Sequence, residues 1–330
     1  MKRKLLRLVM LFVTTVLTNS TFAQSSTLAT LSHEGTISTY YGVTALKEAY
    51  NAAVDGDVIT LASGSYLAID LTKAVSICGA GMGLGAVKNV EPTIISGNFR
   101  MALPADNTLR FTVEGIYHNG TITCNSCKNA MFMKCRFYDF YGYGIQNSTF
   151  VHCRIANRIS LSSDCNATLI SSLLNWVNCS SSTTSNFELW NCILRSQVSD
   201  VKSSSLRNCI AIIDKAPIDG SNTLYNNLIF SVYENFLQNI PNQTNTIVTN
   251  AWAIFETYRT TEIFDDEDFE LTDYAKENYL GNDGTEVGVY GGNLPFDTTP
   301  TNPLITKCNV ASKSTADGKL SVDIEVKAAE

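Results

Sequence analysis

Cysteines are the residues in this chain whose chemistry can be considered first. The sequence contains ten of them. In an oxidising compartment that number would suggest disulfide bonds. Cys124 and Cys127 also have the spacing of a pair of zinc ligands, but a structural zinc site needs a second such pair. Zinc is therefore the lesser interpretation of these two cysteines.

The three histidines do not indicate a hydrolytic triad. They are His33, His118 and His152, and none has an evident nucleophile associated with it. His152 also falls in a column of turn residues that is described below. We therefore interpret His152 as a polar turn residue.

Cysteine recurs because the chain repeats itself. Aligned on one position, which we call the cysteine column, the copies fall at Cys135, Cys153, Ser172, Cys192, Cys209 and Asn227, at steps of 18, 19, 20, 17 and 18 residues. The residue three positions earlier is always apolar: Phe132, Phe150, Leu169, Leu189, Leu206 and Leu224. The residue two positions later is apolar as well: Phe137, Ile155, Leu174, Leu194, Ala211 and Ile229. A repeat of about 18 residues is too short for paired helices and predicts a coil of parallel strands, with one turn per repeat.

The spacing of these columns predicts a bend directly before the cysteine column. Side chains of one strand point the same way only at even separations, so the apolar residue three positions earlier must belong to a different strand. The bend falls on what we call the corner column: Lys134, His152, Ser171, Asn191, Asn208 and Asn226. Asparagine tolerates the left-handed backbone conformation better than other non-glycine residues. We therefore expect a stacked ladder of corners.

The repeat changes the interpretation of the cysteines. Cys135 and Cys153, like Cys192 and Cys209, occupy equivalent positions on neighbouring turns and should lie about 4.8 Å apart, with parallel side chains. A disulfide instead brings the two Cβ atoms to roughly 3.8 Å. We therefore expect buried free thiols that act as small hydrophobic side chains.

The N-terminus has the pattern of an export signal. Residues 1–23 contain four basic residues, then an apolar run over residues 8–17, and then Thr21-Phe22-Ala23, whose small residues suit signal peptidase. The apolar run is too short for a membrane anchor. We expect an exported protein in the periplasm, at the cell surface or outside the cell.

Charge excludes one class of partner. The formal net charge is -7, and removal of the four basic residues of the signal gives -7 - 4 = -11. The mature chain has no basic stripe that could neutralise phosphates, so nucleic acid is not expected as a partner.

Two stretches resemble known proteins. GVTALKEAYNAAVDGDVITLASGSYLAIDLTKAVSICGAG, from residue 42, resembles the start of right-handed parallel β-helix proteins of the pectate lyase-like superfamily. DFELTDYAKENYLGNDGTEVGVYGG, from residue 268, is similar to the closing turn of secreted bacterial members. The resemblance implies an all-β solenoid and an N-terminal helix, roughly residues 44–53, that caps the coil. Leu46, Ala49, Tyr50 and Ala53 recur at helical spacing and independently favour that helix.

The remaining organisation follows from composition. We expect a signal peptide over 1–23, the parallel β-helix with its cap over 24–292, and a Pro/Thr linker over 293–303. Residues 304–330 should form a small β-hairpin, because Asp317-Gly318 separates two alternating runs. Leu320, Val322, Ile324 and Val326 share one face of that hairpin, and they should pack on the last coil or on a partner.

The resemblance implies polysaccharide chemistry, but the residues do not complete a catalytic set. A glycosidase of this superfamily would need paired aspartates, and the Asp265-Asp266 pair lies beyond the repeats. A lyase would need carboxylates on adjacent turns to hold calcium, and a Lys or Arg base. The candidates for this set are Asp164, Asp200 and Asp219 as calcium ligands, with Lys202 and Lys215 nearby. The alternative for these aspartates is ordinary turn chemistry.

Tyrosines provide the candidate ligand-binding residues. In FYDFYGYG, from residue 137, Phe137 belongs to a core column, whereas Tyr138, Tyr141 and Tyr143 should follow it in the variable turn. Their amphipathic rings could stack on sugar faces, or they could simply pack the turn. The acidic run over residues 262–273 is expected to be a solvated face.

We therefore expect an exported β-helix protein that binds a polysaccharide or cell-surface glycan and requires no cofactor, although calcium is compatible with the aspartates. A polysaccharide lyase or glycoside hydrolase acting on an acidic polysaccharide is the first alternative. An adhesive surface protein that binds other proteins is the second.

Overall fold

The computed structural model describes residues 27–83, 91–162, 164–179, 186–199, 204–213, 218–219, 222–231, 237–238, 244–248, 250, 253–257, 269–301, 304–310, 313–315, 317–319 and 321–327. At residues 179, 197–199, 218–219, 237–238, 304–310 and 327 the description covers the backbone alone.

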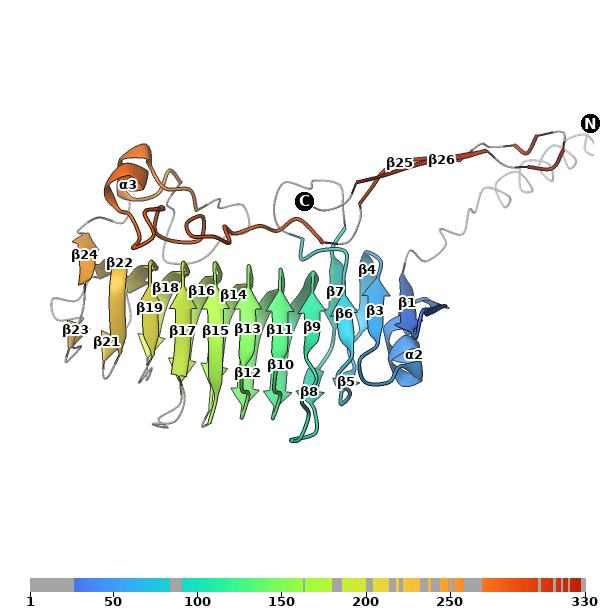
Figure 1. Cartoon of the computed structure of the whole chain (residues 1–330), viewed down its shortest axis with the longest axis horizontal. Coiled ribbons are helices and arrows are strands. Elements are labelled where there is room, and N and C mark those ends of the chain that lie inside the picture. Colours follow the sequence, from blue (N-terminus) through green and yellow to red (C-terminus); the bar gives the residue numbers. More distant parts are fainter. Residues whose placement is uncertain are drawn as a thin grey trace, which may run out of the picture.

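The chain forms a parallel β-solenoid of about eight turns, as the repeat predicts. Figure 1 shows the turns stacked along a horizontal axis, from β1 at one end to β24 at the other. Every turn contributes short strands to long columns, and each strand pairs in parallel with its equivalent on the next turn. Because identical positions meet from turn to turn, the apolar columns of the sequence form one continuous core.

Each turn begins with a strand from the first column. Its members are β3 (Val58–Leu61), β6 (Ser76–Cys78), β9 (Phe111–Glu114), β11 (Ala130–Met133), β13 (Ser148–Val151), β15 (Asn166–Ile170), β17 (Asn186–Trp190), β19 (Ser205–Arg207) and the start of β22 (Thr223–Ser231).

The second and third columns follow after the corner. The second contains β4 (Gly64–Leu67), β7 (Thr93–Ser96), β10 (Ile116–Asn125), β12 (Arg136–Tyr143), β14 (Arg154–Leu161), β16 (Leu173–Cys179), β18 (Ile193–Ser199), β20 (Ile210–Ile213), the end of β22 and β24 (Thr244–Val248). The third contains β5 (Asp70–Leu71), β8 (Phe99–Ala102) and the later halves of β10, β12, β14, β16 and β18. A further parallel pair joins β21 (Ile218–Asp219) to β23 (Leu237–Gln238).

The predicted corner is confirmed at every position. All six residues of the corner column have left-handed backbone conformations, with φ between 43° and 53°. The apolar columns on either side are buried, and their members pair in register between turns, for example Phe132 with Phe150 and Leu174 with Leu194. Even the corners at Lys134 and His152 accept the left-handed conformation, although L-residues with a Cβ pay for it sterically.

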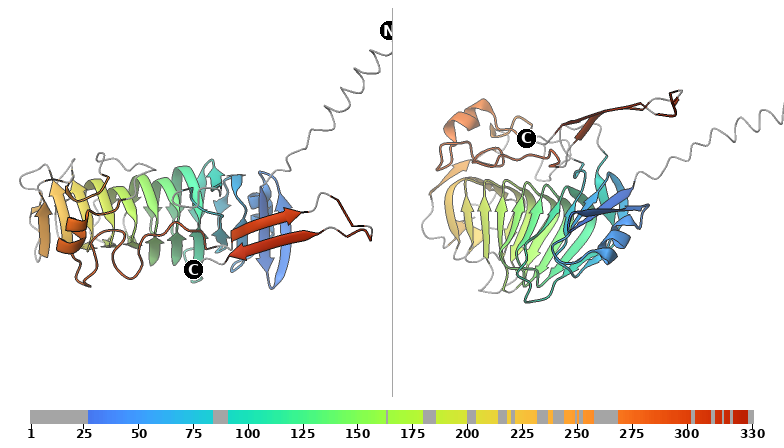
Figure 2. Two further views of the ribbon diagram at one scale, coloured as in Figure 1. Left: turned by 90° about the horizontal axis from the view of Figure 1, so that it is seen from above. Right: turned by 45° about the vertical axis from the view of Figure 1, so that its right-hand side comes forward.

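A segment that we call the return segment, residues 269–301, closes one flank of the solenoid. It includes the helix α3 (Asp273–Asn278) and runs back over the strands from the C-terminal end of the coil (Figures 1 and 2). Its apolar residues, the outward side of the second column, and Ile254 and Phe255 form a second core. This core contains Leu173, Ile193, Ile210, Ile212, Leu228, Val248, Ile254, Phe255, Phe269, Leu271, Ala275, Val287 and Val289.

Polar contacts fix the return segment on the corner column. Lys134 Nζ lies 2.6 Å from Asp297 Oδ2, and His152 Nε2 lies 3.2 Å from the Leu294 carbonyl oxygen. Ser171 Oγ donates to the same carbonyl. Residues 293–301, expected as part of a linker, therefore lie in contact with the solenoid. His152 has a structural contact at the corner, in keeping with its interpretation as a turn residue.

The N-terminal end of the coil differs from the repeats. β1 (Leu28–His33) pairs antiparallel with both β2 (Thr36–Tyr41) and β3. The helix α2 (Ala45–Ala52) lies at this end, and its residues Ala45, Leu46, Ala49 and Tyr50 are part of the main core (Figure 1).

At the C-terminus, β25 (Leu304–Val310) and β26 (Val322–Lys327) pair antiparallel. Val322, Ile324 and Val326 are 51%, 51% and 58% exposed, so they do not pack on the last coil, which was one of the two expectations for this face. Leu320 lies outside the described residues.

Candidate functional site: an aromatic and arginine-lined outer face

The predicted calcium site stays a prediction, because most of its side chains lie outside the described residues. Asp164 lies at a left-handed, exposed turn before β15. The backbone of Asp219 lies on β21, beside Gln238 of β23, and its side chain is outside the description. Asp200, Lys202 and Lys215 lie outside the described residues, as do Asp265 and Asp266. Within the part of the chain that the structure describes, no three His, Cys, Asp or Glu residues are grouped to hold a metal ion.

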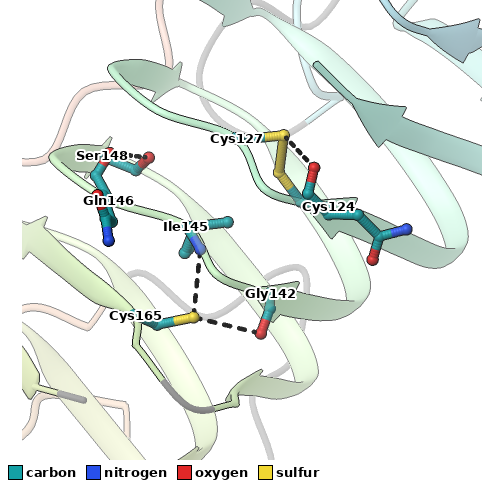
Figure 3. The surroundings of a disulfide bond; sticks show 8 residues. Cys124, Cys127, Gly142, Ile145, Gln146, Ser148 and Cys165 are labelled. Atoms are coloured by element: carbon teal, nitrogen blue, oxygen red, sulfur yellow. Dashed lines mark hydrogen bonds between the residues drawn. A yellow bond between two sulfur atoms is a disulfide. The ribbon is translucent and has the colours of Figure 1, made fainter. Parts of the chain in front are cut away.

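The interpretation of Cys124 and Cys127 changes. Their sulfur atoms are joined in a disulfide, as Figure 3 shows, so this pair is neither a zinc site nor a pair of free thiols. Both cysteines are buried. Sequence spacing alone did not separate a disulfide from a metal site, because C-x-x-C suits both.

The cysteine column contains free buried thiols, as predicted, but they do more than fill space. Cys135, Cys153, Cys192 and Cys209 are unpaired with other sulfurs and fully buried. Each Sγ lies 3.3–3.5 Å from backbone carbonyl oxygens of its own turn and of the preceding turn. These thiols belong to the main hydrophobic core, as predicted, and their sulfur atoms also lie within hydrogen-bonding distance of the backbone.

Hydrogen bonding also explains why serine and asparagine can replace cysteine in this column. The backbone N–H of Cys153 donates to Ser172 Oγ (3.0 Å), that of Cys192 to Cys209 Sγ (3.4 Å), and that of Cys209 to Asn227 Oδ1 (2.8 Å). All three residue types are small and can both donate and accept. They satisfy backbone groups that the bend would otherwise leave unpaired.

These thiols are poor nucleophiles. Burial raises the pKa of Cys135 and Cys192 well above the ordinary range of a thiol. Burial, together with the nearby Glu114, raises the pKa of Cys78 to about 11. Because the thiolate is the reactive form, the cysteine column has a structural role.

The candidate tyrosines lie on a strand and not in a variable turn, which corrects the sequence interpretation. They belong to β12, where a bulge between Phe137 and Asp139 shifts the alternation. Tyr138 and Tyr143 are each 47% exposed, and Tyr141 is half-buried. Phe140 points inward, into a cluster of phenylalanine rings around Phe132 and Phe150.

Tyr141 belongs to a surface that we call the outer face, formed by the outward side chains of the third column. From turn to turn it contains Arg100, Thr123, Asp139, Tyr141, Tyr143, Arg158, Ser160, Trp176 and Asn178. The register places Asp139, Arg158 and Trp176 side by side on three successive turns.

Arg158 is the centre of this face. Its guanidinium lies 5.0 Å from the ring centroid of Tyr141 and 4.7 Å from that of Trp176, within cation–π range of both. Arg158 Nη2 donates a hydrogen bond to Tyr141 Oη. Arg158 Nε has no hydrogen-bond partner among the described residues. The three side chains thus hold one another in place.

The surrounding residues are polar and can form directed hydrogen bonds. Asp139 Oδ1 accepts a hydrogen bond from Asn157 Nδ2 at 2.8 Å, which orients the carboxylate. Arg100 is exposed and lies two turns before Tyr141, in the same row. The outer face therefore combines aromatic surface, guanidinium groups and oriented acceptors.

Sequence analysis missed Arg158 and Trp176. Both lie beyond the second bend of their turns, and their alignment with Tyr141 becomes visible only when the bulge in each turn is placed. The signal available was the recurrence of large polar or aromatic residues 17 to 19 positions apart.

Comparisons add no relatives. No family model, curated protein or solved structure matches the chain. Within the described residues, no helix has the length and apolar character needed to cross a membrane.

Proposed function

We propose that this protein is an exported carbohydrate-associated protein that binds an acidic polysaccharide along the outer face. The observation that carries the proposal is Arg158, whose guanidinium lies within cation–π range of the rings of both Tyr141 and Trp176. Guanidinium groups pair well with carboxylates, and aromatic rings offer rigid contact area at low entropic cost.

Local charge supports an acidic ligand. The chain as a whole carries a formal net charge of -7, yet Arg100 and Arg158 both belong to the outer face, with Asp139 as the acid among the residues that define it. A locally positive surface on an acidic protein concentrates anionic ligands there. The uniform spacing of the turns, about 4.8 Å, also suits an extended polymer.

Affinity electrophoresis tests the proposal. The mature chain from residue 24 is run through gels containing acidic or neutral polysaccharides, with and without calcium. We expect retardation by an acidic polysaccharide, and a loss of about tenfold or more in affinity for Arg158→Met and Trp176→Ala, in line with the loss of a charged hydrogen bond or a stacking residue. Tyr274→Ala is the matched control, because Tyr274 is 63% exposed on α3, on the return segment. Equal retardation of all variants would refute this site.

The same incubation separates binding from catalysis. New absorbance from unsaturated ends would indicate a lyase, and new reducing ends without it a glycoside hydrolase. If cleavage appears, Asp200→Ala and Asp219→Ala should abolish it if these residues hold calcium. If neither cleavage nor retardation is observed, the result favours an adhesive protein that binds other proteins.

Several finer assignments belong to the same proposal. The sequence resemblance supports membership of the pectate lyase-like superfamily and a right-handed coil. The position of α2 supports its capping role, and the pairing of β25 with β26 supports a terminal hairpin. Export is supported by residues 1–23. N-terminal sequencing of secreted protein should start at Gln24.

A further inference from the structure

A hollow lies on a different flank from the outer face, between the corner column and the return segment. It has a volume of about 330 Å³ and lies where β17 and β19 end. Trp190 and Arg207 line it from these strands, Asn191 from the corner, and Asp283 from the return segment. The volume is at the lower end of the range for small-molecule sites.

Two neighbouring corners meet the return segment in different ways. Both amide atoms of Asn208 have partners: Nδ2 donates to Asn282 Oδ1 at 3.0 Å, and Oδ1 accepts from the Asn282 N–H at 3.1 Å. One turn earlier, Asn191 is 8% exposed, and its Nδ2 has no hydrogen-bond partner among the described residues. A buried donor without an acceptor costs free energy, so this amide indicates a missing partner.

Two glycines of the return segment lie against that amide. The return segment passes Asn191 with Gly291 and Gly292, whereas at Asn208, on the next turn, it contributes the side chain of Asn282. A Cβ at Gly292 would lie 3.0 Å from Asn191 Oδ1, and one at Gly291 would lie 2.9 Å from Asn191 Nδ2. Side chains at these positions would therefore crowd the amide group.

The other lining residues offer a balanced set of groups. Trp190 is 40% exposed and provides an apolar ring. Arg207 is positioned by stacking on Tyr225, with its guanidinium 5.6 Å from the ring centroid. Asp283 Oδ1 is oriented by Thr285, whose N–H and Oγ1 both donate to it. Asp283 would repel an anionic ligand, and Arg207 would repel a cationic one. Hydroxyl groups, in contrast, can accept hydrogen bonds from the arginine and donate them to the aspartate.

We propose that this hollow binds a neutral sugar, one terminal or side-branch ring of a glycan, with its hydroxyl groups on Asn191, Arg207 and Asp283 and its apolar face on Trp190. The site is separate from the outer face and does not depend on it.

Isothermal titration and tryptophan fluorescence test this site. The mature chain is titrated with glucose, galactose, mannose, N-acetylglucosamine, cellobiose and lactose, and with glucuronate and glucosamine as charged counterparts. We expect at least one neutral sugar to bind with a Kd of roughly 1 mM or better and to change Trp190 emission, while the charged counterparts bind more weakly.

Asn191→Gly is the decisive variant. Glycine retains the left-handed corner without strain and removes the amide alone. It should weaken binding of the neutral sugar about tenfold, as should Trp190→Ala. Asn147→Gly is the matched control, because Asn147 is an exposed left-handed residue at a different corner.

The proposal is overturned if no neutral sugar binds, or if Asn191→Gly binds as tightly as the unchanged chain. Retardation by an acidic polysaccharide is measured in the same variants and should persist in Asn191→Gly. This comparison distinguishes failure of the hollow from failure of the outer face.

Discussion

At the scale of single residues, Cys209 shows that a thiol can act as a hydrogen-bonding group of the backbone. Its Sγ accepts from the Cys192 N–H at 3.4 Å and lies 3.4 and 3.3 Å from the carbonyl oxygens of Leu189 and Arg207. Cys209→Val replaces the thiol with a somewhat larger apolar side chain that cannot form these hydrogen bonds, and we expect it to lower the free energy of unfolding by about 1–3 kcal/mol.

Cys209→Ser is the control, because Ser172 already occupies an equivalent position. It should cost less than the valine variant in urea unfolding monitored by circular dichroism. If the valine variant is as stable as the unchanged chain, the thiols contribute packing alone.

Sequence predicted the residues of the main corner because parity is a strict rule of strands. Each corner residue from Lys134 to Asn226 has the expected left-handed backbone. The same rule failed for Tyr141, because a bulge in each turn resets the alternation at a place that the residue types do not mark. It also could not place residues far apart in the chain, such as Asn191 and Gly292.

At the scale of elements, one ion pair at the N-terminal end predicts a pH dependence. His33 Nδ1 lies 2.8 Å from Asp57 Oδ1. The hydrogen bond and charge of Asp57 raise the pKa of His33. Burial opposes ionisation of Asp57, but hydrogen bonds from Val54 and His33 outweigh it and hold the pKa of Asp57 below its usual range.

The signs define a window. The contribution of a raised histidine is complete below its unfolded pKa of about 6.5 and is lost as pH rises through the folded value. The contribution of a depressed aspartate is present above about pH 4 and is lost as pH falls through its folded value. The melting temperature of His33→Gln should therefore be lower than that of the unchanged chain, and this difference should be largest at about pH 5–6. A difference independent of pH would contradict this account.

The return segment should loosen in acid. Burial disfavours the charged form of Asp297, yet hydrogen bonds from Lys134 and Thr299 outweigh burial and lower the pKa of Asp297. Its stabilising contribution is present above about pH 4 and is lost as pH falls through the folded pKa. The protection of residues 293–301 from hydrogen exchange, relative to the intrinsic exchange rate at each pH, should fall below that pH, and Asp297→Asn should show low protection already at neutral pH. Lys134→Asn, which keeps a residue suited to the corner, should behave in the same way.

At the scale of the whole molecule, the solenoid needs its return segment. The second core buries Ile193 and Ile210 of the coil against Leu271 and Val289. A chain that ends at residue 268 should therefore expose a contiguous apolar flank, melt at a lower temperature and bind a hydrophobic dye. A truncated chain with unchanged melting temperature would show that the flank does not depend on this cover.

The corner column also determines where the return segment can dock. Its residues differ from turn to turn, and three of them have partners suited to their side chains: Lys134 has Asp297, Ser171 has the Leu294 carbonyl, and Asn208 has Asn282. Sliding the segment by a single turn would leave the lysine without its carboxylate and would place asparagine side chains against a corner that fits glycine. The variation among corner residues therefore fixes a single register for the return segment on an otherwise regular coil.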